Sequence, residues 1–373
     1  MRYAADVCEN ISEPGCLTMH TSNNICNFTN KKRFIILFLF LLSLLTLLCG
    51  CKQAAPAEEK THSAVKSSSD VKPAGGNPEQ SYSAKDDTGR TLVFKTKPCR
   101  IVSVTYGTDE ILKTLAGPER IAAYSRHAGD PEISFLSKED VKRVGKKVEN
   151  NSEAIFALHP DLVVISTSTG ADELRTLESM GLAVYVAMSP KTYQEMRQKV
   201  RNLGLATGEP QKTANLLKRM DERMNALEKR LQTIPDDKRR TAVAFSMTGP
   251  MGRKGELFDS MMKLAHVING AATVHPLGIK GQISKEQVVQ VNPDMFLLPT
   301  WNYDKHSDPE KFARELMEDP AYRNVKAVKN RKMVYVSDRY RYVASHHIVD
   351  AVENIAYAVY PELFPEGKPE DQE

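Results

Sequence analysis

Aromatic and cationic side chains gather in the loops that are expected to follow the strands of this chain. The one tryptophan, Trp301, lies in such a loop, and so does the run Arg339-Tyr340-Arg341-Tyr342. Aromatic rings suit a large flat or conjugated ligand, and guanidinium groups suit its carboxylates or phenolates. The predicted ligand-binding residues are Tyr106, Arg126, His127, Thr248, Trp301, Tyr303, Arg339, Tyr340, Arg341 and Tyr342.

Apolar runs separated by helical patterns predict the strands that would position these loops. The expected strands include residues 100–105, 121–124, 162–166, 241–245 and 332–336. Strands that alternate with helices indicate mainly parallel sheets with helices on their faces. Ligands of such sheets bind beyond the carboxyl ends of the strands, which is where the predicted ligand-binding residues fall.

One phrase of the sequence occurs twice. Residues 151–166, NSEAIFALHPDLVVIS, align without a gap on residues 284–299, SKEQVVQVNPDMFLLP. Glu153 then falls on Glu286, and each copy carries Pro-Asp before an apolar run. A single helix-to-strand connector of this kind is common, but two copies aligned over their whole length indicate two similar lobes.

A long amphipathic helix is predicted over residues 210–233, between the two copies. The fold class is therefore α/β, with two three-layer lobes of mainly parallel sheet joined by one long rigid helix. The expected divisions are an N-terminal α/β lobe at 84–209, the interlobe helix at 210–233, a C-terminal α/β lobe at 234–366 and a tail at 367–373.

The N-terminal segment has the pattern of a signal peptide with a lipobox, residues 1–51. A basic KKR precedes a short apolar run, and Leu48-Cys49-Gly50-Cys51 makes Cys51 the predicted lipidation site. An uncleaved membrane anchor is the alternative, and Met19 is an alternative start because residues 1–30 are long for an n-region. Residues 52–83 are rich in Ala, Ser, Pro and charge, and are predicted to form a disordered tether.

The order of these features resembles the helical-backbone (class III) substrate-binding proteins of ABC importers, which bind ferric siderophores, haem or cobalamin. The resemblance covers about residues 84–366. It rests on DDTGRTLVF…PCRIVSV, the two copies of the phrase, the long helix and NVKAVKNRKMVYVSD…AYAVYPELF. It implies two lobes with the ligand in the cleft between them.

The resemblance also implies partners and roles. Glu153 and Glu286 match the two family glutamates that dock on permease arginines. The expected function is capture of an iron complex, a ferric siderophore or haem, for an ABC permease and its ATPase; a tyrosinate or His127 could then ligate the iron. We expect an extracytoplasmic, lipid-anchored monomer without a cofactor of its own. Cobalamin is the alternative ligand.

Other classes find less support. The formal net charge is only +4, and there is no nucleic-acid motif, so no nucleic-acid partner is expected. An extracytoplasmic lipoprotein hydrolase would need a nucleophile with a base, and the sequence has neither G-x-S-x-G nor H-E-x-x-H. His346, His347 and Asp350 have the spacing of a metal site, but we expect them to be polar residues at the start of the last helix.

Overall fold

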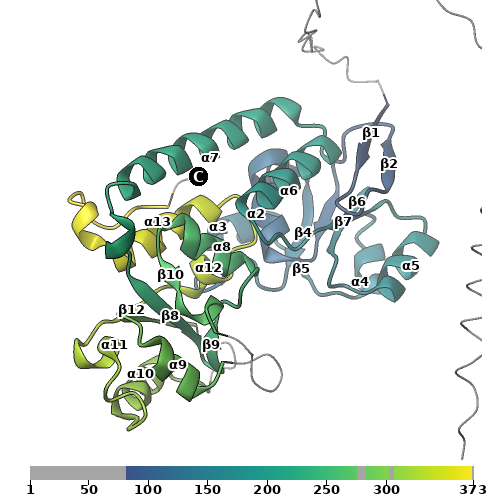
Figure 1. The fold of residues 1–373 in the computed structure, drawn as a ribbon. Coiled ribbons are helices and arrows are strands. Elements are labelled where there is room, and N and C mark those ends of the chain that lie inside the picture. Colours follow the sequence, from purple (N-terminus) through teal and green to yellow (C-terminus); the bar gives the residue numbers. More distant parts are fainter. Residues whose placement is uncertain (1–80, 275–282, 302–305, 372–373) are drawn as a thin grey trace, which may run out of the picture. The chain divides into compact units, whose positions relative to one another are not determined.

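The computed structural model describes residues 81–274, 283–301 and 306–371 (Figure 1). They belong to one compact unit, Ala74–Glu373. The predicted signal peptide, Cys51 and Tyr303 lie outside the described residues. Within those residues, none of the helices combines the length and the apolar character that a membrane crossing requires.

An antiparallel hairpin opens the described chain. It consists of β1 (Tyr82–Lys85) and β2 (Thr91–Phe94). The Tyr82 ring stacks on Phe94 with 5.1 Å between ring centroids, and its hydroxyl donates to the Ala206 carbonyl at 2.9 Å. The predicted tether of residues 52–83 is wrong at its last two residues, because Tyr82 and Ser83 belong to β1. Residues 52–80 lie outside the described residues.

The first sheet is entirely parallel, with the strand order β5-β4-β3-β6-β7. Ile101 and Val102 belong to different hydrophobic clusters, because successive side chains of a strand point to opposite faces. Both faces are thus covered. The strands are β3 (Ile101–Ser103), β4 (Ile121–Ser125), β5 (Lys147–Val148), β6 (Leu162–Ser166) and β7 (Val184–Ala187). The helices are α2 (Tyr106–Ala116), α3 (Lys138–Val144), α4 (Ser152–Phe156), α5 (Ala171–Ser179) and α6 (Tyr193–Ala206).

The second sheet has the parallel order β10-β8-β11-β12, with β9 antiparallel to β8 at its side. Val243 and Ala244 again belong to different hydrophobic clusters. The strands are β8 (Thr241–Ser246), β9 (Gly249–Met251), β10 (Ile268–Asn269), β11 (Met295–Leu298) and β12 (Met333–Tyr335). The helices are α8 (Leu257–Leu264), α9 (Lys285–Val291), α10 (Pro309–Glu318), α11 (Lys326–Lys329), α12 (Asp338–Arg341) and α13 (Ile348–Val359).

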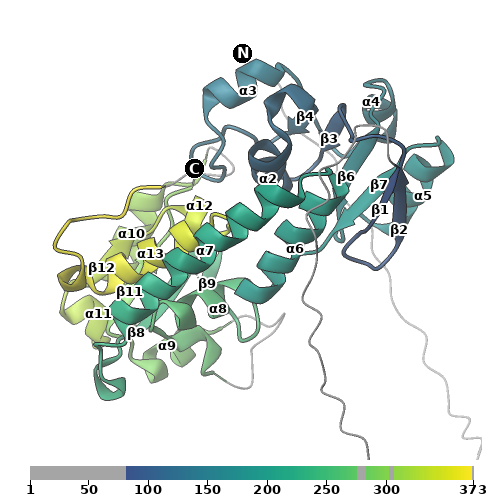
Figure 2. The ribbon, with the colours of Figure 1, turned by 90° about the horizontal axis from the view of Figure 1, so that it is seen from above.

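The long helix is α7 (Pro210–Leu231), and it connects the segments that carry the two sheets. Its buried side chains recur at helical spacing, and the helix packs on α6 and α13. Figure 2 shows α7 beside these two helices. The apolar residues of this face are Leu216, Leu217, Met220, Met224, Leu227 and Leu231. The predicted α/β class with two parallel sheets and one long helix is confirmed.

The two copies of the duplicated phrase each begin with a short helix that is capped in the same way. Asn151 caps α4 by accepting a hydrogen bond from Ala154 N, and Ser284 caps α9 by accepting from Gln287 N. The backbone then turns left-handed at the equivalent residues His159 (φ 48°) and Asn292 (φ 49°). Each glutamate consequently lies at the second helical position of its own helix.

The Pro-Asp part of the phrase also has one structural role in both copies. Asp161 accepts a hydrogen bond from the Arg100 amide at 2.9 Å, and Asp294 accepts one from the Thr241 amide at 2.9 Å. Each carboxylate thus fixes the start of the neighbouring central strand. The sequence repeat is a structural repeat of helix, turn and strand.

Candidate ligand-binding site

A cavity of about 240 Å³ lies at the carboxyl ends of β3, β6 and β7; it is called the strand-end cavity here. Tyr106 and Gly107 line it from the start of α2, and Leu257 and Ala344 line it from the C-terminal half of the chain. Its other lining residues are Thr105, Ser166, Ser168, Ala187, Met188, Ser189, Pro190 and Lys199. Both halves of the chain therefore build one hollow at the edge where parallel sheets bind ligands.

Lys199 is the cation of this cavity and was missed by the sequence analysis. It lies on α6 with 3% of its surface exposed, and its ammonium donates to the Ala344 carbonyl at 2.9 Å. Burial lowers its pKa to about 8, although Asp87 and Glu110 act in the opposite direction. A lysine inside a helical pattern gives no sequence signal of burial, because surface helices carry many lysines.

The close approach of the two halves depends on Gly107 and Glu110. A Cβ on Gly107 would lie 2.5 Å from the Ala344 carbonyl oxygen, so only glycine fits there. Glu110 is buried; it accepts from the Phe135 amide at 2.9 Å and from the Ser345 hydroxyl at 2.5 Å. Burial raises the pKa of Glu110. Together these contacts hold residues 344 and 345 against the first turn of α2.

Two of the predicted ligand-binding tyrosines meet across the halves. The Tyr106 hydroxyl donates to the Tyr342 carbonyl at 2.7 Å. Burial raises the pKa of both phenols, so both are protonated at neutral pH. Direct ligation of a metal by Tyr106 would require loss of its proton and of this hydrogen bond. Tyr342 keeps 36% of its surface exposed.

A second cross-contact brings together Arg126, His127 and Trp301. The Arg126 guanidinium donates to His127 Nε2 at 2.9 Å, and the His127 ring meets Trp301 edge-on with 6.1 Å between ring centroids. Burial, followed by the Arg126 charge, lowers the pKa of His127. The neutral imidazole, the exposed guanidinium and the indole therefore form one aromatic and cationic wall, which we call the His127 wall.

The Arg339–Tyr342 stretch is not the loop that the sequence analysis expected, because its first three residues lie in α12. Arg341 is 2% exposed and forms an ion pair with Asp338 at 3.0 Å. Tyr340 is also buried, and Arg339 pairs with Asp371 at 2.5 Å. In this arrangement Tyr340 and Arg341 support the fold from inside, so a direct contact with ligand would require them to move.

Thr248 is the last predicted ligand-binding residue among those that the structure describes, and Glu132 is a residue that the sequence did not indicate. Thr248 is exposed at the turn between β8 and β9, within 3.0 Å of the Ser246 hydroxyl. Glu132 was not predicted, yet it accepts from the Thr300 hydroxyl at 2.9 Å, beside Trp301. This contact joins the two halves of the chain, and only the tertiary structure brings these positions together.

The residues His346, His347 and Asp350 are engaged within the protein. His347 Nδ1 lies 2.7 Å from an Asp350 carboxylate oxygen, and Arg223 pairs with the same aspartate at 2.7 Å. His346 Nε2 lies 3.3 Å from the Thr114 hydroxyl. Among the described residues no group of three or more His, Cys, Asp or Glu side chains has the arrangement of a metal site.

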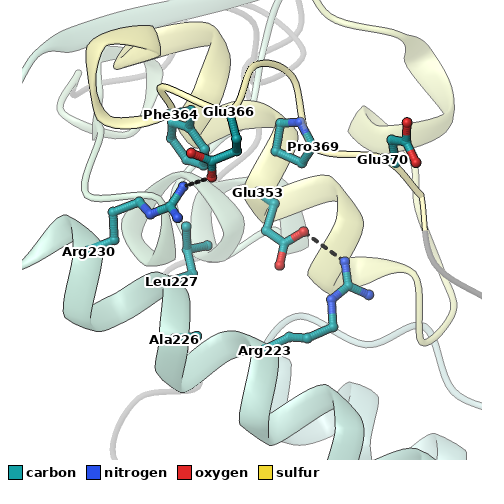
Figure 3. A pocket seen from close by; sticks show the side chains of 9 residues that line it. All are labelled: Arg223, Ala226, Leu227, Arg230, Glu353, Phe364, Glu366, Pro369 and Glu370. Atoms are coloured by element: carbon teal, nitrogen blue, oxygen red, sulfur yellow. Dashed lines mark hydrogen bonds and ion pairs between the residues drawn. The ribbon is translucent and has the colours of Figure 1, made fainter.

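A cavity of about 270 Å³ lies elsewhere, between α7 and the C-terminal segment (Figure 3). Four of its charged groups are paired: Arg223 with Glu353 at 2.7 Å, and Arg230 with Glu366 at 2.5 Å. The Arg230 guanidinium also lies over the Phe364 ring. This cavity lies away from the strand ends, and its ion pairs hold the C-terminal segment on α7.

The two glutamates of the repeat are exposed on their helices. Glu153 lies on α4 and Glu286 on α9, and neither forms an ion pair in the part of the chain that the structure describes. A hydrogen bond from Ser284 lowers the pKa of Glu286. Both helices lie on the side of the described residues away from α7 (Figure 1).

Comparisons with known proteins agree with this architecture. The chain is 22% identical to a cobalamin-binding protein of Halobacterium salinarum over 56% of each chain, so it spans about half of that relative. It is 23% identical to the probable siderophore-binding lipoprotein YfiY of Bacillus subtilis over 83% of this chain and 91% of that protein. The solved periplasmic heme-binding protein RhuT from Roseiflexus sp. RS-1 superposes with a TM-score of 0.59, at 21% identity, over 71% of this chain and 98% of that one. A family model described as periplasmic binding protein matches residues 101–340, and the chain belongs to that family.

Proposed function

We propose that this chain is the extracytoplasmic substrate-binding component of an ABC importer and that its ligand is an iron complex. The observation that carries the proposal is the strand-end cavity, which both halves of the chain line and which contains the buried cation Lys199. Ferric siderophores commonly carry carboxylate, hydroxamate or catecholate oxygens, and an ammonium and hydroxyl groups are suitable donors for them. The siderophore-binding relative, aligned over most of both chains, supports the same ligand class.

Three further statements belong to the proposal. Cys51 carries the lipid that anchors the chain outside the cytoplasm, which the lipoprotein relative supports. Glu153 and Glu286 dock on the permease. The chain acts by binding and release and catalyses no reaction, as expected for a member of a solute-binding family.

The test uses the full chain and its one tryptophan. Ferric citrate, a ferric catecholate, haem and cobalamin are titrated separately while Trp301 fluorescence and visible absorbance are recorded. We expect one ferric complex to quench the Trp301 fluorescence in a saturable way, because Trp301 belongs to the wall of aromatic and cationic side chains that includes His127.

The outcomes separate the alternatives. Saturable binding of cobalamin alone would assign the chain to the cobalamin relative's ligand class, and absence of binding by all four probes would refute the iron-complex proposal. Turnover of ester or peptide substrates without stoichiometric binding would favour the hydrolase alternative.

A further inference from the structure

A further cavity, of about 230 Å³, lies between α7 and the start of α13, and we call it the α7–α13 cavity. Leu216 and Met220 of α7 are buried and form its apolar side. None of its lining residues also lines the strand-end cavity. Its volume is sufficient for several water molecules or for one small ion.

His346 is a buried polar residue of this cavity. It is 5% exposed, and its Nε2 lies 3.3 Å from the Thr114 hydroxyl. Its Nδ1 is buried and has no hydrogen-bond partner among the described residues. A neutral imidazole has one N–H and one acceptor nitrogen, so Nδ1 carries the proton when Nε2 accepts from Thr114. A buried N–H without an acceptor lowers stability, and an oxygen atom of a ligand would satisfy it.

The surroundings of His346 favour a negative charge. Burial lowers the pKa of His346 well below its ordinary value, and His347, Arg219, Lys113 and Arg223 act in the same direction. The imidazole is therefore neutral at neutral pH, and it lies among cations. His346 also directly precedes the first turn of α13, where the helix dipole favours an anion. This potential attracts an anion and disfavours a metal cation.

The charged side chains of the cavity wall leave one cation without a partner. Arg223 pairs with Asp350 at 2.7 Å, and a Glu222 carboxylate oxygen lies 3.7 Å from the Lys218 ammonium. Arg219 is exposed on α7 and forms no hydrogen bond or ion pair within the described residues. An exposed guanidinium and a buried N–H thus line the same cavity, and together they form a suitable donor set for an oxyanion.

We propose that the α7–α13 cavity binds one small oxyanion of the sulfate or phosphate type between the Arg219 guanidinium and His346 Nδ1. The anion would link α7, which connects the two sheets, to the start of α13. Anion binding should therefore stabilise the packing of α13 on α7. The inference is independent of the proposed function, because this cavity and the strand-end cavity share no lining residue.

The test titrates sodium sulfate and sodium phosphate into the full chain, purified in detergent, with sodium chloride of equal ionic strength as the reference. Calorimetry measures affinity, and thermal unfolding measures stabilisation. We expect one-to-one binding and a higher Tm than in chloride. Arg219→Met should weaken binding at least about tenfold, because it removes the charged donor. Lys229→Met, which removes an exposed cation of α7 outside the cavity, is the matched control and should bind like the wild type.

A second measurement reports on the buried end of the cavity. Proton–nitrogen NMR spectra of the histidine side chains follow the same titration, and His346→Gln identifies the His346 signals. We expect the Nδ1 signal of His346 to shift and to saturate with the calorimetric Kd. An unchanged His346 signal, with binding weakened in Arg219→Met, would place the anion on the surface at Arg219 alone and overturn the proposal.

Two other outcomes would also refute the site. Equal rises of Tm in the wild type, Arg219→Met and Lys229→Met would indicate a general salt effect. Absence of calorimetric binding of both sulfate and phosphate would show that the cavity holds only water.

Discussion

Lys199 is a cation that the fold holds at the strand-end cavity. Its helix places it there, and the Ala344 carbonyl satisfies one of its three donors. Because burial penalises the charged form, its pKa of about 8 lies well below that of an exposed lysine. The ammonium is charged at neutral pH and becomes neutral within an accessible pH range.

The Lys199 charge should make anion binding dependent on pH. Below about pH 8 the ammonium is protonated and attracts an anionic chelate; above it the attraction is lost. We expect the affinity for ferric citrate to fall as the pH rises from about 7 to 9, and Lys199→Met to lower the pH 7 affinity about tenfold and to remove most of this dependence.

Lys212→Met is the matched control for that prediction. Lys212 also donates to a backbone carbonyl, that of Leu115 at 3.1 Å, but it lies on α7 outside the strand-end cavity. Fluorescence titration at several pH values measures both variants. An unchanged pH profile in Lys199→Met would show that the ligand does not use this cation.

At the scale of elements, the repeated helix, turn and strand explains how both sheets are assembled. In each copy an aspartate after the helix binds the amide that starts a central strand. The left-handed backbone at His159 and Asn292 turns the chain so that the aspartate two residues later reaches that amide. The same local solution thus positions β6 beside β3 and β11 beside β8.

Removal of the aspartate side chain should lower the stability of the protein by a similar amount in both copies of the repeat. We expect Asp161→Ala and Asp294→Ala each to lower the free energy of unfolding by about 1 kcal/mol, since each removes a side-chain acceptor from a strand-starting amide. Urea unfolding measures it. Asp172→Ala removes an exposed carboxylate that pairs only within α5 and should change little. A large difference between the two copies would contradict equivalent roles.

At the scale of the whole molecule, the residues proposed for ligand binding and those proposed for permease docking lie in different parts of the structure. Tyr106 with Tyr342, and Glu132 with Thr300, join the halves around the candidate site. Glu153 and Glu286 lie outside it on α4 and α9. Ligand capture and permease docking should therefore be separable by mutation.

Charge reversal tests that separation. We expect Glu153→Arg with Glu286→Arg to leave ferric citrate binding unchanged and to reduce uptake into proteoliposomes at least about tenfold, because a cation would then face a cation on the permease. Glu310→Arg is the matched control: Glu310 is also an exposed glutamate at the second position of a helix, but it lies outside the repeat. Uptake that persists in the double reversal would contradict docking through these glutamates.

The sequence by itself determined the main helices and strands and their order, although not β1 or α12. Hydrophobic periodicity, N-caps and the repeated phrase report local preferences, so α7, the parallel strands and the equivalence of Glu153 and Glu286 could be predicted. The sequence placed Trp301 and His127 in two loops at strand ends, but it did not predict that their rings are in contact.

The tertiary structure alone decided which side chains face the cavity. Arg341 and Lys199 are both cations in helices, yet Arg341 is used in a buried ion pair with Asp338 while Lys199 lines the hollow. The close approach at Gly107 and Ala344 likewise joins positions more than two hundred residues apart. Burial and long-range contact depend on how all elements pack together, and no local pattern of residues records them.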